Sequence, residues 1–143
     1  KGLHEVINSR DIADLIPPAR TRADNFVKQC KAAGIDVLIT STYRDAASQS
    51  AIYAQGRTTP GKIVTNAKAG QSWHNYRCAF DFVPVVNGKA QWNDLATFTK
   101  CGEIAEHCGL EWAGRWKKFK ELAHCQYTGG RTLADLQKGL TIA

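Results

Sequence analysis

The chain has 143 residues, a formal net charge of +6 and 43% hydrophobic residues. This length fits a single domain over residues 1–143, and such a domain buries roughly 68–70% of its unfolded surface. Five cysteines, an odd number without a Cys-x-x-Cys pair, argue against a disulfide framework and a thiolate zinc knuckle. No run approaches the ~18 apolar residues of a membrane span, and no secretion signal is present, so we expect folding in a cytoplasm without membrane insertion.

Helical and extended segments alternate in the first half of the chain. Two prolines open a helix predicted for residues 17–33, and the β-branched stretch 35–42 predicts a strand. Asp45 can cap a second helix that reaches about Gln55. Residues 57–71 then predict a loop, and loops of this length in compact domains tend to be functional.

The second half carries a hairpin signal. Residues 78–86 predict the clearest strand, and Asn87-Gly88 predicts a tight turn that returns the chain through residues 89–92. Helices that bracket a hairpin-rich sheet without a repeated βαβ rhythm indicate the α+β class. The remaining predicted elements are a helix from Asp94 that ends before Gly109, strands near 110–112 and 123–127, and a helix over 132–138.

Two histidines and an aspartate have the residue types of a catalytic metal site. Three nitrogen or oxygen ligands from His74, Asp81 and His124 would leave a position for water, whereas structural zinc sites usually close with four ligands. Asp81 interrupts an apolar strand, where an unpaired carboxylate would be costly to bury. On spacing alone, an exposed Asp81 and two ordinary polar histidines remain open alternatives.

Three more side chains are candidates for substrate chemistry. Glu121 can act as general acid and base for a zinc-activated water, or it can be a surface residue beside neighbouring lysines. Arg44 follows a strand end and can bind a carboxylate or an oxyanion, or it can pair with Asp45 on the surface. Ser72 can contact substrate or orient its loop. Three tryptophans can line a cleft or belong to the core: Trp73, Trp112 and Trp116.

Other residues offer rival sites, and four basic residues form a charged cluster. His107 with Cys101, Cys108 and Cys125 could form a thiolate zinc site, but the spacing on one helix is poor. The chain lacks both the Gly-x-Ser-x-Gly elbow of serine hydrolases and the His-Glu-x-x-His metalloprotease helix. A basic cluster is either a solvated surface or an attraction for an anionic polymer. It comprises Arg115, Lys117, Lys118 and Lys120.

The chain resembles the zinc D-Ala-D-Ala carboxypeptidase and L-alanyl-D-glutamate endopeptidase family, and in particular its phage endolysin branch. The resemblance covers roughly residues 9–139 and implies zinc on His74, Asp81 and His124, with Glu121 as the catalytic carboxylate. Two departures are Arg77 in place of a glycine and Ala123-His124-Cys125 in place of Pro-His-Phe. The motifs are Ser72-x-His74-x6-Asp81, Glu121-x-x-His124, Thr42-Tyr43-Arg44-Asp45, Tyr53 to Thr58, Pro60-Gly61, Ile63 to Ala67 and Gly109 to Trp112.

This resemblance implies a mixed α+β domain with a central antiparallel sheet flanked by helices, as in DD-peptidases and the metal-binding part of Hedgehog proteins. It implies a monomeric endolysin that cuts the L-alanyl-D-glutamate bond of peptidoglycan stem peptides, with no nucleic-acid partner. The protein would reside in the host cytoplasm before lysis and act on the wall afterwards. The alternatives are a D-Ala-D-Ala carboxypeptidase and a non-catalytic wall-binding module.

Overall fold

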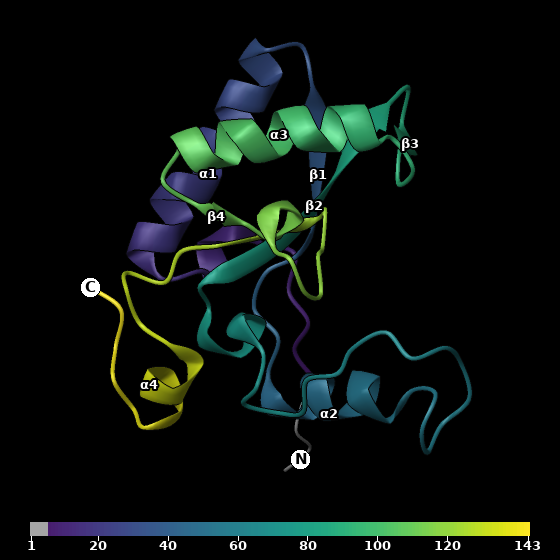
Figure 1. Ribbon diagram of the computed structural model, residues 1–143, viewed down its shortest axis with the longest axis vertical. Coiled ribbons are helices and arrows are strands. Elements are labelled where there is room, and N and C mark those ends of the chain that lie inside the picture. Colours follow the sequence, from purple (N-terminus) through teal and green to yellow (C-terminus); the bar gives the residue numbers. More distant parts are fainter. Residues whose placement is uncertain (1–5) are drawn as a thin grey trace.

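The computed structural model describes residues 6–143 (Figure 1), so the first five residues of the expected 1–143 domain lie outside the described part. Helices and strands are mixed along the chain, and each predicted element is present. The helices are α1 (Pro17–Ala32), α2 (Ala46–Ala54), α3 (Leu95–His107) and α4 (Leu133–Gln137); the strands are β1 (Asp36–Ser41), β2 (Ala79–Val86), β3 (Lys89–Ala90), β4 (Glu111–Trp112) and β5 (His124–Gln126); and the 3-10 helices are η1 (Ile12–Asp14), η2 (Trp73–Tyr76) and η3 (Ala113–Arg115).

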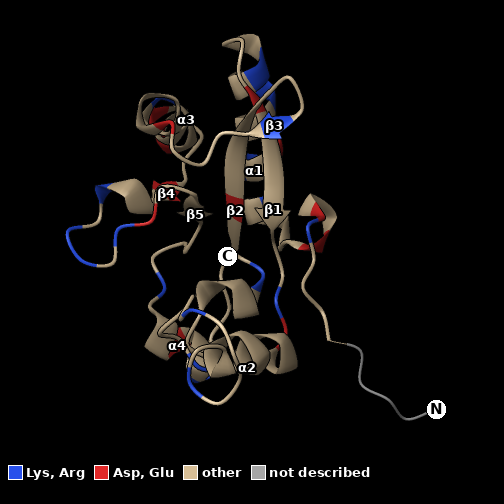
Figure 2. Cartoon of the chain, turned by 90° about the vertical axis from the view of Figure 1, so that its right-hand side faces the viewer, with Lys and Arg blue, Asp and Glu red and all other residues tan. Residues whose placement is uncertain are grey.

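One antiparallel sheet runs through the centre of the molecule. Its strand order is β1-β2-β5-β4, and β3 pairs with the far end of β2. Figures 1 and 2 show α1 and α3 around the upper part of the sheet and α2 and α4 at the opposite end of the molecule. The α+β prediction, with a central antiparallel sheet flanked by helices, is therefore confirmed.

The core lies between the sheet, α1 and α3. Phe80 and Phe82 of β2 pack there with Phe26 of α1 and Phe98 of α3. Because side chains alternate along a strand, Asp81 between these two phenylalanines points to the opposite face. The core therefore fixes β2 from behind while its other face carries polar chemistry.

Local sequence signals set the start of α2 and the turn after β2. The Asp45 side chain accepts a hydrogen bond from the Ser48 backbone N–H at 2.8 Å and begins α2. Asn87 and Gly88 both have positive φ, as a two-residue hairpin turn requires. The returning strand is shorter than the expected 89–92. Gln91 still donates its backbone N–H to the Pro84 carbonyl at 2.8 Å, but Pro84 has no N–H with which to complete this ladder pair.

Arg77 adopts a conformation that glycine favours. Its backbone is left-handed, with φ 59° and ψ 31°, at the position where the family pattern has glycine. An arginine pays roughly 1–2 kcal/mol for this conformation. Its guanidinium lies 3.8 Å from the Tyr43 ring centroid and donates to the Asp14 carbonyl at 3.1 Å, and these contacts offset the cost. The turn before β2 thus keeps a glycine-type geometry without glycine.

The cysteines behave as small apolar groups, as the composition indicates. All five cysteines are free thiols, and four of them are buried. Burial raises the pKa of Cys125 well above its usual value and that of Cys78 to about 12, so both remain protonated and behave as apolar groups. Across residues 6–143, no helix combines the length and apolar character needed to cross a membrane.

Candidate metal centre

The sheet and one short helix bring the three predicted ligands together. Asp81 of β2 and His124 of β5 are direct cross-strand partners, so their side chains share one face of the sheet. His74 lies on η2, which leads into β2. One ligand atom from each residue lies within 4.8 Å of the other two, and in the described range this is the one group of three or more such residues that can hold a metal ion.

Hydrogen bonds fix which nitrogen of each imidazole faces the centre. His74 Nδ1 lies 2.8 Å from the Thr42 carbonyl oxygen, so this nitrogen carries the proton and donates it. His124 Nε2 lies 2.7 Å from Gln126 Oε1 and donates likewise. His74 Nε2 and His124 Nδ1 therefore present lone pairs, at 3.2 and 3.3 Å from Asp81 Oδ1. Histidines that bind metals show this arrangement, with the second nitrogen held by an acceptor.

The electrostatics keep Asp81 ionised. Burial alone would raise the pKa of Asp81, but the positive charge and the N–H donors that His74 and His124 offer when protonated hold that pKa well below its usual range. Burial works against protonation of His124, yet hydrogen bonding to Asp81 and its charge raise the pKa of His124. Two imidazole nitrogens and one carboxylate form a donor set that suits zinc and leaves a coordination position for water.

Glu121 lies at the rim of this cluster. Its Oε1 is 3.8 Å from His124 Nδ1, and its side chain is 58% exposed. Among the described residues, that imidazole is the one ionisable group within ion-pair distance, so the surface pairing with Lys118 or Lys120 is not formed. The competing Glu111 accepts a hydrogen bond from the Trp116 indole instead.

Trp112 holds the segment that carries Glu121. Its indole N–H donates to the Leu122 carbonyl at 2.8 Å, one residue after Glu121. The ring lies between Gly102 of α3 and Gly114, where a methyl group at either glycine would overlap it. Trp112 is therefore a buried core residue, as one of the two sequence-based alternatives predicted. It does not line the cleft.

Arg44 lines the same cavity as the metal ligands and Glu121. Its Nη1 donates to Gln49 Oε1 at 3.1 Å and its Nη2 to Ser41 Oγ at 3.2 Å, while its buried Nε has no hydrogen-bond partner among the described residues. Burial lowers the pKa of Arg44, while the charges of Asp81 and Glu121 raise it. The Asp45 carboxylate caps α2, so the alternative surface pair with Arg44 is absent.

The structure shows one of the two roles that the sequence allowed for Ser72. Its hydroxyl accepts from the His74 backbone N–H at 3.2 Å, and Asn75 completes a capping box around η2. Ser72 therefore orients the turn that carries His74. It also lines the cleft, where its contact with substrate stays a prediction.

Two adjoining cavities form the cleft. The first, of about 370 Å³, is lined by the three metal ligands, Arg44, Ser72 and Glu121. The second, of about 550 Å³, shares Glu121 with the first cavity and extends to Phe119. Trp73 and Trp116 line both. The cleft therefore continues past Glu121, away from Arg44.

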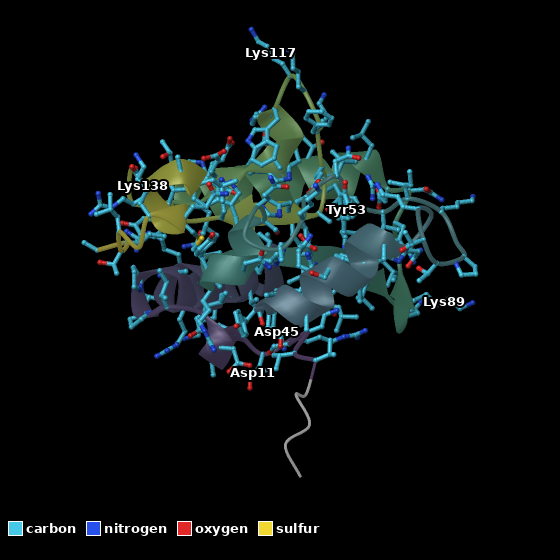
Figure 3. The ribbon with its side chains drawn as sticks, turned by 90° about the horizontal axis from the view of Figure 1, so that it is seen from below. Asp11, Asp45, Tyr53, Lys89, Lys117 and Lys138 are labelled. Carbon is cyan, nitrogen blue, oxygen red and sulfur yellow. The ribbon has the colours of Figure 1, made fainter. Side chains whose placement is uncertain are left out.

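The rival residues lie elsewhere. Cys101 and Cys125 are part of the core, so the thiolate site with His107 and Cys108 is not formed. Arg115 pairs with Glu106, with Nη2 and Oε1 3.0 Å apart, so its charge is largely compensated. The uncompensated part of the basic cluster is the loop of Lys117, Lys118 and Lys120, which projects from the body with Lys117 at its tip (Figure 3).

Comparisons with known proteins agree with this geometry. Residues 65–127 match the family described as D-alanyl-D-alanine carboxypeptidase. The peptidoglycan L-alanyl-D-glutamate endopeptidase CwlK of Bacillus subtilis is 36% identical, over 80% of this chain and 74% of CwlK.

Solved structures share the fold at low sequence identity. The L-Ala D-Glu endopeptidase ChiX of Serratia marcescens superposes with a TM-score of 0.61 at 17% identity, covering 86% of this chain and 90% of ChiX. The LD-carboxypeptidase LdcB gives a TM-score of 0.68 at 21% identity, over 98% of this chain and 70% of LdcB.

A further structure contains the metal. The D,D-pentapeptidase VanY from a VanB-type resistance cassette, solved with Zn(II), gives a TM-score of 0.64 at 14% identity, over 98% of this chain and 89% of VanY. The present chain has a matching fold and a donor set that suits zinc. It therefore belongs to the family of zinc metallopeptidases that includes the D-alanyl-D-alanine carboxypeptidases and the endopeptidase CwlK.

Proposed function

We propose that this chain is a monomeric zinc endopeptidase, on a single domain over residues 1–143, that hydrolyses the L-alanyl-D-glutamate bond of peptidoglycan stem peptides. One observation carries the proposal. Arg44 and Glu121 lie in the same cavity as His74, Asp81 and His124, so an anion-binding group, a carboxylate and a metal site adjoin one scissile bond.

The residues divide the work of hydrolysis. When bound by His74, Asp81 and His124, zinc lowers the pKa of a water to about 7 and polarises the scissile carbonyl. Glu121 takes a proton from the attacking water and returns it to the leaving amine. Its side chain is 58% exposed, and His124 is its one ion-pair partner within residues 6–143, so the carboxylate can move between these two positions. Thr42 and Gln126 hold the two imidazoles in the orientation that ligation needs.

Arg44 gives the site its preference for an acidic leaving group. D-glutamate in the stem is linked through its γ-carboxyl group, so its α-carboxylate remains free beside the scissile amide. Arg44 lines the cavity, and a guanidinium can bind this carboxylate or the oxyanion of the transition state. Ser72 lines the same cavity and can donate its hydroxyl to substrate.

A D-Ala-D-Ala carboxypeptidase is the second candidate, because the matched family carries that description and VanYB has been solved with D-alanine-D-alanine. Two observations favour the endopeptidase. CwlK is the more similar protein in sequence. The cleft also continues beyond Glu121, which suits a substrate that extends on both sides of the cut bond.

Digestion of purified peptidoglycan followed by mass spectrometry tests the reaction. We expect new amino-terminal D-glutamate, and none with Glu121→Gln. Release of D-alanine alone would assign the carboxypeptidase activity. Absence of any turnover by the zinc-loaded protein would leave a wall-binding module on the same fold.

We also infer that the biological role is that of a phage endolysin, which stays in the host cytoplasm until lysis and then acts on the wall, without nucleic acid or membrane insertion as part of its function. The motifs from Thr42 to Trp112 support this branch of the family. Expression in a bacterium should leave cells intact until the membrane is permeabilised, after which turbidity should fall. Lysis without permeabilisation would contradict this timing, and size-exclusion chromatography at active concentrations tests the monomer.

A further inference from the structure

An apolar extension of the cleft takes no part in the chemistry described above. Its residues come from two loops and α4, and we call them the apolar subsite: Ile63, Val64, Trp116, Phe119 and Leu133. Ile63 and Val64 are 56% and 60% exposed, and Phe119 is 74% exposed. Exposed apolar residues that meet in one concave patch indicate a binding surface more often than scattered ones do.

Phe119 is held in this position against its own preferences. Its backbone φ is 53°, in the left-handed region that an aromatic residue rarely adopts. Its ring contributes little to the core because most of it faces solvent. Such backbone strain tends to occur at ligand-binding sites. The loop therefore presents this ring for contact with something other than the protein itself.

The two ends of the cleft differ in charge. Arg44 lines the first cavity and not the second, whereas Glu121 and Trp116 line both. Arg44, the metal ligands and Glu121 thus share the first cavity with Val64 and Trp116, while Ile63, Phe119 and Leu133 of the apolar subsite line the second cavity alone. If Arg44 binds the α-carboxylate of the leaving D-glutamate, the acyl side of the scissile bond points toward Phe119.

The chemistry of the acyl side fits an aromatic surface. In intact peptidoglycan, L-alanine is joined through a lactyl ether to a pyranose with an N-acetyl group. The carboxyl group of that lactyl ether is consumed in the amide, so this part of the substrate is uncharged. Pyranose rings have apolar C–H faces that pack against aromatic side chains, which are large and rigid contact surfaces.

We propose that the apolar subsite binds the N-acetylmuramoyl sugar attached to L-alanine, so that the enzyme selects glycan-linked stem peptides over free ones. This inference rests on the proposed endopeptidase function. It assigns Phe119 and the Ile63-Val64 loop to substrate selection, separate from the proton transfer and the metal ligation.

Two soluble substrates with the same scissile bond test the proposal. One is N-acetylmuramoyl-L-alanyl-γ-D-glutamyl-L-lysine, and the other carries a plain N-acetyl group on L-alanine. We expect wild type to have the higher kcat/KM on the muramoyl substrate. Phe119→Gly should lower this preference about three- to tenfold, as the loss of one aromatic contact predicts. Phe119→Tyr should keep it.

Stability separates a binding role from a structural one. Glycine tolerates the left-handed backbone, so Phe119→Gly should not lower the melting temperature. Leu95→Ala is the matched control, because Leu95 is 61% exposed and lies at the start of α3, outside both cavities. The control should leave the substrate preference unchanged.

Each contrary outcome has a distinct meaning. Equal kcat/KM of wild type on both substrates, or an unchanged preference in Phe119→Gly, would overturn the proposal. If wild type cleaves neither substrate, the endopeptidase function fails, and the subsite is then decided by NMR titration with N-acetylmuramoyl-L-alanine. Binding that Phe119→Gly weakens at least threefold would support the subsite, and unchanged binding would overturn it. No sugar preference, together with Phe119-dependent sedimentation with phosphatidylglycerol vesicles, would overturn it in favour of a lipid surface.

Discussion

The paired strands and the exposed loops of this molecule position their side chains in different ways. Asp81 and His124 face each other across β2 and β5, and hydrogen bonds from outside the cluster fix the imidazoles. Glu121 and Phe119 instead lie on the connection after η3 and are mostly exposed. Two of the three groups that can hold the ion, Asp81 and His124, lie on the sheet, whereas groups that move a proton or contact variable substrate lie on loops.

Removing a ligand from the sheet should have the largest effect. His124→Ala should lose stoichiometric zinc and, with it, all measurable turnover, because two ligands cannot replace three on one ion. Elemental analysis after dialysis measures this loss. His107→Ala removes an exposed histidine of α3 outside the cluster and should keep both metal and activity. Full zinc content in His124→Ala would remove this residue from the site.

On the loop, Glu121→Gln should lower kcat by about 10²–10⁴ while the zinc content stays at the wild-type level. The amide keeps the shape of the side chain but cannot accept a proton. Steady-state kinetics on a soluble muropeptide measures the change, with Glu111→Gln as the matched control. A near-normal rate in Glu121→Gln would transfer the general base to another residue.

A second prediction for the sheet concerns Gln126, the residue that holds the imidazole of His124. Gln126→Leu removes the acceptor for His124 Nε2 while it keeps a buried side chain of similar size. We expect metal affinity to fall about 10–100-fold, the usual cost of losing such a partner. Competition with a chelator measures the dissociation constant. An unchanged constant would show that the strand alone orients the imidazole.

Arg44 lies in the connection between β1 and α2, and its exchange should show an intermediate effect. Arg44→Lys should lower kcat/KM on the soluble muropeptide by roughly tenfold, because an ammonium cannot replace the planar guanidinium donors or span from Gln49 to Ser41. Lys68→Arg, the reverse exchange on an exposed loop residue, is the control. Normal cleavage by Arg44→Lys would exclude a catalytic role for the guanidinium.

The smallest effect is expected on the basic loop. Replacing Lys117, Lys118 and Lys120 with glutamine should weaken cell-wall sedimentation several-fold at low salt and little at physiological ionic strength, where the Debye length is ~8 Å. Cleavage of the soluble muropeptide should not change. Impaired cleavage of that small substrate would instead place these lysines within the active site.

Sequence reasoning identified the groups with distinctive chemistry. His74, Asp81, Glu121 and His124 carry recognisable residue types at a spacing that a strand and a turn impose, and the structure brings them together. Gln126 was missed, although it lies two residues after His124 and must share its face of β5. A glutamine on a strand is usually an ordinary polar residue. Its role becomes visible only once the structure shows that it contacts the His124 imidazole.

Other contacts could not be predicted because they depend on tertiary packing. The Thr42 carbonyl that holds His74 belongs to the backbone, so no residue type announces it. The pairing of Arg115 with Glu106 joins η3 to α3, whereas the run of basic residues indicated only a charged cluster. The return strand after Asn87-Gly88 is shorter than expected since Pro84 accepts from Gln91 but cannot donate in return, an effect that register alone reveals.

Trp112 links a helix on the far side of the core to the loop that carries Glu121. Its indole fills the space that side chains at Gly102 and Gly114 would need, and it holds the Leu122 carbonyl. Two positions without any functional group are thereby as constrained as a catalytic residue. As related sequences diverge, selection for catalytic activity would keep glycine at position 102. Helix formation would not, because glycine is a poor helix former. Random mutagenesis screened for activity would therefore map part of the active site onto the middle of α3.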